Sequence, residues 1–240
     1  MKHGFSLHSG AWLGRAAGVS LLAAASLLFA LVSRGHEAPH ASRMDFVPPA
    51  PGSYQLQRIM AVPQGTVVDI DGKARKLSGY TTGKVTLLSF IYTYCADPKG
   101  CPLAYEVLQS LKKSVKDVPG MGEKVRFVSL SFDPQNDTPD VMQAYGGADA
   151  RDMRGLRWYF LTTRSSKELL PLLDGLGQDV SVAADRPAGS RVPMLSHMLK
   201  VFLIDTHGQV REIYTTSFLL PNVVMNDIKT LLMEDGNIAR

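Results

Sequence analysis

The sequence predicts an α/β domain, and three observations support this fold class. From about residue 57 onward, short runs rich in β-branched and aromatic residues alternate with amphipathic helical patterns. Residues 85–92 form an unbroken apolar run, which is typical of a central strand buried on both faces. Residues 67–77 and 198–214 carry Asp-Gly and His-Gly between strand-like runs, which predicts two β-hairpins.

The other elements follow in order along the chain. A helix is predicted from Pro102, which suits a first helical turn, and Ala104, Leu108 and Leu111 lie on its apolar stripe. The later elements are a strand at 125–132, a helix from Asp137 or Thr138, a strand at 156–162, a helix at 165–177 and a last helix from Pro221. The stretch between Gly177 and His197 shows no period, so we expect a long loop there.

The first 33 residues predict a signal peptide or a membrane anchor. Residues 16–32 are apolar and uncharged, with Lys2 and Arg15 before them and Arg34 after them. This length lies between a signal-peptide core and the roughly 20 residues of a spanning helix, so cleavage and retention both stay open, with retention preferred. The positive N-terminus predicts export of the rest of the chain to the periplasm, tethered to the inner membrane.

Composition sets the domain boundaries and excludes one class of partner. Residues 34–56 are rich in Pro, Ala and Ser without an apolar period, which predicts a flexible linker before a domain at 57–240. The formal net charge is +4, and most of it lies in the first 43 residues. Since the chain has no cluster of Lys and Arg suited to phosphates, we expect no nucleic-acid partner.

The two cysteines predict a reactive site. Cys95 and Cys101 fall between the strand at 85–92 and the helix from Pro102, at the carboxyl end of a central strand. The N-terminus of a helix stabilises a thiolate, which is both a nucleophile and a metal ligand. Two cysteines at this spacing can also form a disulfide if the loop turns back. A structural disulfide or two inert buried thiols remain the alternative.

Three segments resemble the Sco/SenC family of copper chaperones: SFIYTYCADPKGCPLAYEVL, RFVSLSFDPQNDTPDVMQAYG and LSHMLKVFLIDTHGQVREIY. The resemblance runs from about Val67 to the last helix. It implies a thioredoxin-like fold, in which a central mixed sheet is flanked by helices, with added N-terminal and C-terminal β-hairpins. It also implies that Cys95, Cys101 and His197 bind a copper ion, and soft thiolates with one imidazole suit that metal.

Several residues near this implied site differ from the family pattern or allow two interpretations. The spacing here is C-x5-C, where the family carries C-x3-C, and no acidic residue precedes His197. Met194 and Met198 flank the histidine instead; their thioethers are acceptable ligands for cuprous ion, but we expect them to fill the core. Asp133 is expected either to orient the loop or His197 from a neighbouring strand, or to form a turn before Pro134.

The resemblance implies a metallochaperone rather than an enzyme. Its partner would be cytochrome c oxidase subunit II, or another copper acceptor, to whose copper A site it delivers copper or whose cysteines it reduces. An exported thioredoxin-like protein would supply the reducing thiols. Two alternatives stay open: an exported thiol–disulfide oxidoreductase or thiol peroxidase using Cys95 and Cys101, and a copper or redox sensor. Disulfide exchange does not need His197, so that residue distinguishes the first alternative.

Overall fold

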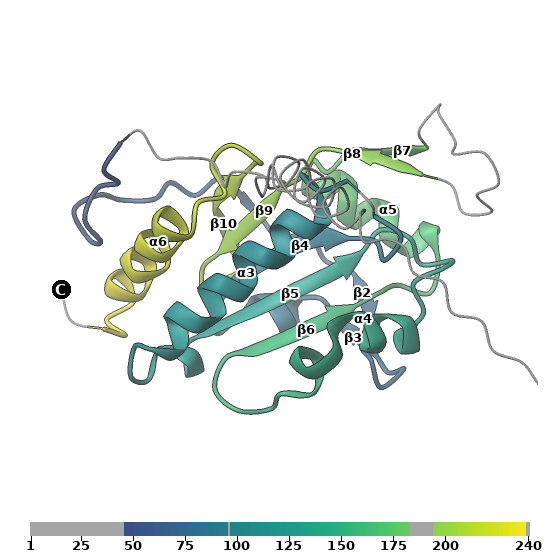
Figure 1. The fold of residues 1–240 in the computed structure, drawn as a ribbon, viewed down its shortest axis with the longest axis horizontal. Helices are drawn as coiled ribbons and strands as arrows, with labels where there is room; N and C mark the ends of the chain where they lie inside the picture. Colours follow the sequence, from purple (N-terminus) through teal and green to yellow (C-terminus); the bar gives the residue numbers. More distant parts are fainter. Residues whose placement is uncertain (1–45, 96, 183–193, 239–240) are drawn as a thin grey trace, which may run out of the picture. The chain divides into compact units, whose positions relative to one another are not determined.

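The structure is a computed structural model that describes residues 46–95, 97–182 and 194–238. Its centre is a six-stranded sheet with the order β1-β10-β9-β4-β5-β6 (Figure 1). The strands are β1 (Met60–Ala61), β4 (Val85–Ile91), β5 (Val125–Ser131), β6 (Arg157–Leu161), β9 (Val201–Ile204) and β10 (Gln209–Tyr214). Strands β4, β5 and β6 are parallel, whereas β9, β10 and β1 are antiparallel additions, so the sheet is mixed as predicted.

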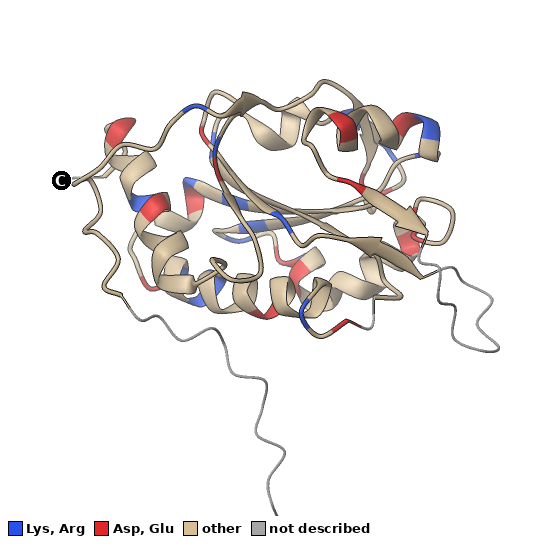
Figure 2. Cartoon of the chain, turned by 90° about the horizontal axis from the view of Figure 1, so that it is seen from above, with Lys and Arg blue, Asp and Glu red and all other residues tan. Residues whose placement is uncertain are grey.

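Helices cover both faces of the sheet, as Figures 1 and 2 show. One face carries α3 (Cys101–Lys116), α4 (Pro139–Arg151) and α6 (Pro221–Glu234). The other face carries α5 (Ser166–Gly175) and the short helix α2 (Ser78–Thr81), whose Tyr80 packs edge-on against Tyr159 of β6. A short 3-10 helix, η1 (Met121–Glu123), precedes β5. This arrangement confirms the predicted α/β class and the helix-flanked mixed sheet.

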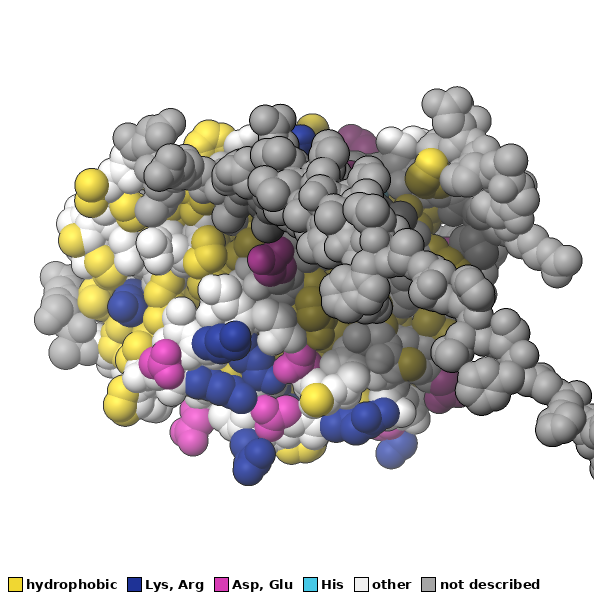
Figure 3. Space-filling view, viewed as in Figure 1, with side chains coloured by type: hydrophobic (Ala, Val, Ile, Leu, Met, Phe, Trp, Pro, Cys, Tyr) yellow, Lys and Arg dark blue, Asp and Glu magenta, His cyan; other side chains and the backbone are white. Residues whose placement is uncertain are grey.

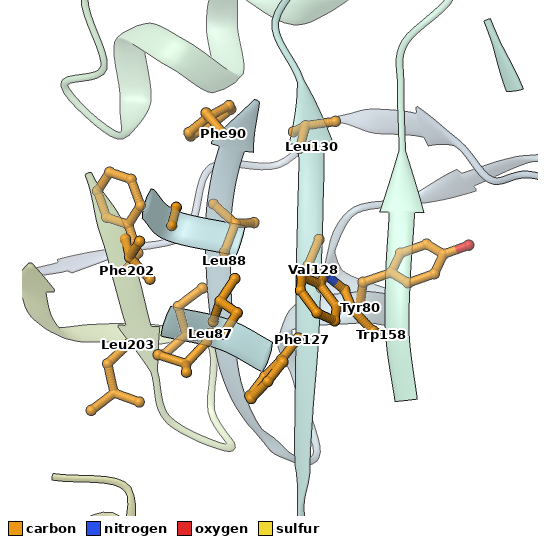
Figure 4. Packing of buried hydrophobic residues seen from close by; sticks show 14 of the residues in the cluster. Tyr80, Leu87, Leu88, Phe90, Phe127, Val128, Leu130, Trp158, Phe202 and Leu203 are labelled. Carbon is orange, nitrogen blue, oxygen red and sulfur yellow. The ribbon is translucent and has the colours of Figure 1, made fainter. Parts of the chain in front are cut away.

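The core lies on both sides of the two central strands. All seven residues of β4 and all seven of β5 are buried. Successive side chains of a strand point to opposite faces, so Leu87 and Leu88 pack into different layers, beside Phe127 and Val128 of β5 (Figure 4). Each large apolar side chain buried in this way contributes roughly 1.5–3 kcal/mol to folding. The burial of both strands therefore fixes the positions of their carboxyl ends.

Two small hairpins lie outside the main sheet. The first, β2 (Thr66–Val68) with β3 (Ala74–Lys76), is the hairpin predicted at 67–77, and Gly72 has a φ of 73° in its turn. The second, β7 (Val180–Val182) with β8 (Leu195–His197), corrects the expectation of a loop at the two ends of the stretch between Gly177 and His197, whose residues 183–193 lie outside the described part of the chain. None of its six strand residues is buried, so no apolar period marked them in the sequence.

Part of the predicted linker packs against the domain. The backbone N–H of Gly52 donates to Thr230 Oγ1 at 3.0 Å, and the Tyr54 hydroxyl donates to Asp227, both on α6. Arg211 of β10 donates to the carbonyl of Leu56, which is buried. The folded part therefore begins before the predicted boundary at residue 57.

The predicted anchor at 16–32 and most of the predicted linker lie outside the described residues. Within the described part of the chain, no helix combines the length and apolar character needed to cross a membrane.

Charged side chains on the face that carries α3 and α4 occur in both signs (Figure 3). Lys112 of α3 is buried and its Nζ lies 2.6 Å from Asp149 Oδ1 of α4. Lys116 lies 3.1 Å from Asp152, directly after α4. These pairs join the two helices; the exposed pair contributes little, whereas removing one partner of the buried pair would leave the other charge uncompensated.

Candidate metal centre

The structure brings the three predicted ligands together. Donor atoms of Cys95, Cys101 and His197 all lie within 4.8 Å of one another. The loop after β4 supplies Cys95, the first residue of α3 is Cys101, and the last residue of β8 is His197. Cys101 Sγ lies 4.0 Å from His197 Nε2. Throughout the described ranges, no second group of three or more Cys, His, Asp or Glu converges in this way.

Two tight turns bring the cysteines together across their five-residue spacing. The N–H of Cys95 donates to the carbonyl of Tyr92 at 3.1 Å, and the N–H of Gly100 donates to that of Asp97 at 2.9 Å. A Cβ at Gly100 would lie only 3.3 Å from Cys95 Sγ, so glycine leaves room for the sulfur. Both thiols are free in this structure. The C-x5-C loop therefore converges without a disulfide.

The two thiols have opposite protonation tendencies. A hydrogen bond from Cys101 lowers the pKa of Cys95 to about 6, although partial burial opposes that shift. The same bond and the deep burial of Cys101 raise the pKa of its own thiol. At neutral pH Cys95 is therefore a thiolate that accepts a hydrogen bond from the Cys101 thiol. Binding a metal to both sulfurs then releases one proton, from Cys101.

His197 is held by aromatic packing. Its ring centroid lies 4.6 Å from that of Phe132 and 6.0 Å from that of Tyr92, which it meets edge-on. Burial lowers the pKa of His197, so the imidazole is neutral at neutral pH and keeps a lone pair for a metal. Its Nδ1 is buried and has no hydrogen-bond partner among the residues that the structure describes. The two aromatic rings, together with the long contact between Nε2 and Cys101 Sγ, set the orientation of the imidazole.

Asp133 is placed at the end of β5, but its side chain forms a turn. It is buried, and its Oδ2 accepts from Asn136 Nδ2 at 2.8 Å. Its backbone carbonyl accepts from the N–H of Asp137 at 2.8 Å. No hydrogen bond joins it to Cys95, Cys101 or His197 among the described residues. Of the two roles considered for Asp133, the contacts match the turn.

A different carboxylate, Asp137, connects the site to the core. It is fully buried and accepts from Thr93 Oγ1 and Ser131 Oγ, each at 2.5 Å, and from the N–H of Thr93. Thr93 lies in the loop that leads to Cys95, so Asp137 fixes the start of that loop to the end of β5. The sequence predicted Asp137 at a helix start and within a segment that resembles the Sco/SenC family, but it predicted no role for Asp137 at the site.

The flanking methionines do not fill the core. Met194 is 38% exposed and Met198 is 62% exposed, so that expectation was wrong. Both lie directly beside the short strand β8, none of whose three residues is buried. Met194 lines a cavity of about 250 Å³ together with Tyr92, Cys95, Asp97 and His197.

The fold and the site define a class: a thioredoxin-like protein with two thiols and an imidazole arranged to hold one metal ion. A sequence profile of the SCO1/SenC family matches residues 63–233. The chain therefore belongs to the SCO1/SenC family, as the sequence resemblance predicted.

Solved structures show the same fold at low sequence identity. Bradyrhizobium japonicum ScoI with copper bound is 22% identical, with a TM-score of 0.53 over 72% of this chain and 100% of that one. Arabidopsis thaliana ScoI with copper bound is 19% identical, with a TM-score of 0.57 over 72% and 99%. BsSco, described as having a disulfide switch and as a member of the Sco family of cytochrome c oxidase assembly proteins, is 24% identical, with a TM-score of 0.55 over 74% and 98%. A comparison with curated protein sequences finds no match.

Proposed function

We propose that this protein is a copper-binding metallochaperone that acts in cytochrome c oxidase assembly. The observation that carries the proposal is the convergence of Cys95, Cys101 and His197 within 4.8 Å. Two thiolates and a neutral imidazole form a donor set that suits copper. The copper in the two ScoI structures supports the same metal here.

Copper is the cargo of this site, and three protein ligands leave room for a fourth from a partner. The Cys95 thiolate is available at neutral pH, because the Cys101 thiol stabilises it. The acceptor we propose is the copper A site of cytochrome c oxidase subunit II, to which this protein delivers copper or whose cysteines it reduces. Since a disulfide would remove two ligands, an exported thiol reductant keeps Cys95 and Cys101 reduced.

The proposed location is the periplasmic face of the inner membrane. The support is the apolar run at 16–32 with basic residues before it. Membrane fractionation of the full-length protein against a variant lacking residues 1–33 tests this proposal. We expect the full-length protein in the membrane fraction, with its folded domain on the exported side. We expect the truncated protein in the soluble fraction. Full-length protein in the soluble cytoplasmic fraction would contradict it.

Thiol–disulfide exchange is a second candidate function, and the thiol pair itself favours it. A thiolate at Cys95 beside a protonated Cys101 is the arrangement of an attacking and a resolving cysteine. The two functions differ in their need for His197. We expect His197→Ala to abolish copper binding while leaving disulfide exchange largely intact.

The decisive experiment is an anaerobic titration of the reduced protein with cuprous ion against a competing chelator. We expect one copper per chain, and a loss of affinity of about 100-fold or more in Cys95→Ala, Cys101→Ala and His197→Ala. His207→Ala is the matched control, because His207 is exposed in the turn between β9 and β10. Unchanged copper binding in His197→Ala would overturn the site.

A further inference from the structure

Met194 lines a cavity that it shares with two of the three predicted metal ligands, Cys95 and His197. Cys101, the first residue of α3, is only 1% exposed. One side of the His197 ring is covered by Phe132, which is itself buried. Cys95 and His197 both line the cavity of about 250 Å³ that Met194 also lines. His197 also lines a second cavity, but only the one with Met194 reaches a cysteine, so we take it as the route by which an ion enters the site.

The cavity has two further side chains that can donate to a metal ion, Met194 and Asp97. The Asp97 carboxylate already accepts a hydrogen bond from the N–H of Lys99 at 3.0 Å, and carboxylate oxygen is a hard donor. The Met194 thioether is a soft donor that suits cuprous ion, and it binds without losing a proton. Of the two, Met194 is the better ligand for the reduced metal.

The geometry points to Met194 as a transient copper ligand, an inference that rests on the proposed function. Cuprous ion first binds the Met194 thioether together with Cys95. When the ion moves inward, the bond to the thioether breaks, the bond to Cys101 forms, and Cys101 releases its proton to solvent. The oxidation state of copper does not change, and delivery reverses these steps.

Transfer kinetics separate a transient ligand from a permanent one. Stopped-flow exchange of cuprous ion between the full-length protein and a chromogenic chelator measures loading and release. We expect Met194→Leu to slow both rates by about tenfold while the equilibrium affinity changes by less than about twofold. Leucine keeps the apolar volume and removes the sulfur.

The control variant is Met198→Leu. Met198 is more exposed and lines a different cavity, which His197 also lines but which neither Cys95 nor Cys101 lines. We expect its transfer rates to equal those of the wild type. Equal rates in Met194→Leu and the wild type would overturn the inference. So would a loss of affinity in Met194→Leu as large as its loss of rate, because that marks a permanent ligand or a structural defect.

Silver(I), a redox-silent substitute for cuprous ion, supplies a second measurement. In Cys101→Ala the inner position is incomplete, so excess silver is held at the outer position. We expect the methyl resonance of Met194, and not that of Met198, to shift in the NMR spectrum, and an unshifted Met194 would overturn the inference. If the wild-type protein binds copper through its three ligands but the Met194 resonance does not shift and Met194→Leu leaves the transfer rates unchanged, only this inference fails. If the wild type binds no copper, the proposed function fails first.

Discussion

The cysteine half of the metal centre rests on the buried core, whereas the histidine half rests on a two-stranded hairpin. Cys95 follows β4, whose seven residues are all buried, and Cys101 begins the sixteen-residue helix α3. His197 ends β8, and neither β7 nor β8 contains a buried residue. The local stability of a segment depends on its buried apolar contacts. Displacing the cysteine half therefore requires more free energy than displacing the histidine half.

The contrast teaches how one site can both hold and release a metal. The sulfurs are fixed by the core and by Asp137, while the imidazole is held by Phe132, Tyr92 and a short hairpin. The Tyr92 hydroxyl also reaches the carbonyl of Leu195 on β8, at 3.5 Å. Removing His197 from the metal therefore disturbs few contacts, while moving a cysteine disturbs the sheet.

The largest expected effect is a difference in stability between truncations in the two regions. Leu88→Ala in β4 leaves a cavity in a fully buried site and is expected to lower the free energy of unfolding by about 2–5 kcal/mol. Val182→Ala in β7 changes a side chain that is 68% exposed, so we expect a change within about 0.5 kcal/mol. Urea unfolding measures both. A cost above about 1 kcal/mol for Val182→Ala would break the comparison.

A smaller effect is expected at the junction between the core and the cysteine loop. Asp137→Ala leaves the hydroxyls of Thr93 and Ser131 without their acceptor, and we expect it to cost about 1–3 kcal/mol. Asp133→Ala is the matched control, since that side chain accepts only from Asn136 among the described hydrogen bonds, and we expect about 1 kcal/mol or less. The same unfolding measurement compares them, and equal costs would contradict the role of Asp137.

The smallest expected effect tests whether the two halves are independent in the metal-free protein. The thiolate fraction of Cys95 rises with pH through its pKa, so its alkylation rate should be half-maximal near pH 6. The main cause is the hydrogen bond from Cys101, so Cys101→Ala should move the midpoint toward the ordinary cysteine value of about 8.5. His197→Ala should leave it near 6. Equal shifts in the two variants would show that the halves are coupled.

The core-supported half of the site was predictable from the sequence. The apolar run of β4 and the Pro102 after Cys101 identified a strand, a loop and a helix start, and the structure places the helix start only one residue earlier, at Cys101. Patterns of this kind are strong because burial on both faces excludes polar residues. The strand and helix patterns therefore predicted that both thiols lie between the end of β4 and the first turn of α3.

The hairpin-supported half was predictable only through the family resemblance. β7 and β8 are three residues each and unburied, so no hydrophobic period distinguishes them from a loop. For the same reason, the sequence pattern did not show that Met194 and Met198 are exposed. Asp137 was missed because its partners, Thr93 and Ser131, belong to other segments, and such long-range hydrogen bonds leave no local pattern.

The aromatic rings around His197 also give the site a spectroscopic signal of its own. Phe132 lies 4.6 Å from the imidazole with an interplanar angle of 59°, and Tyr92 meets it edge-on. Circulating π electrons in these rings shift the resonances of nearby protons. The ring protons of His197 therefore report, in a proton spectrum, whether the histidine is seated against the aromatic pair. His207, exposed in its turn, provides the unshifted reference in the same molecule.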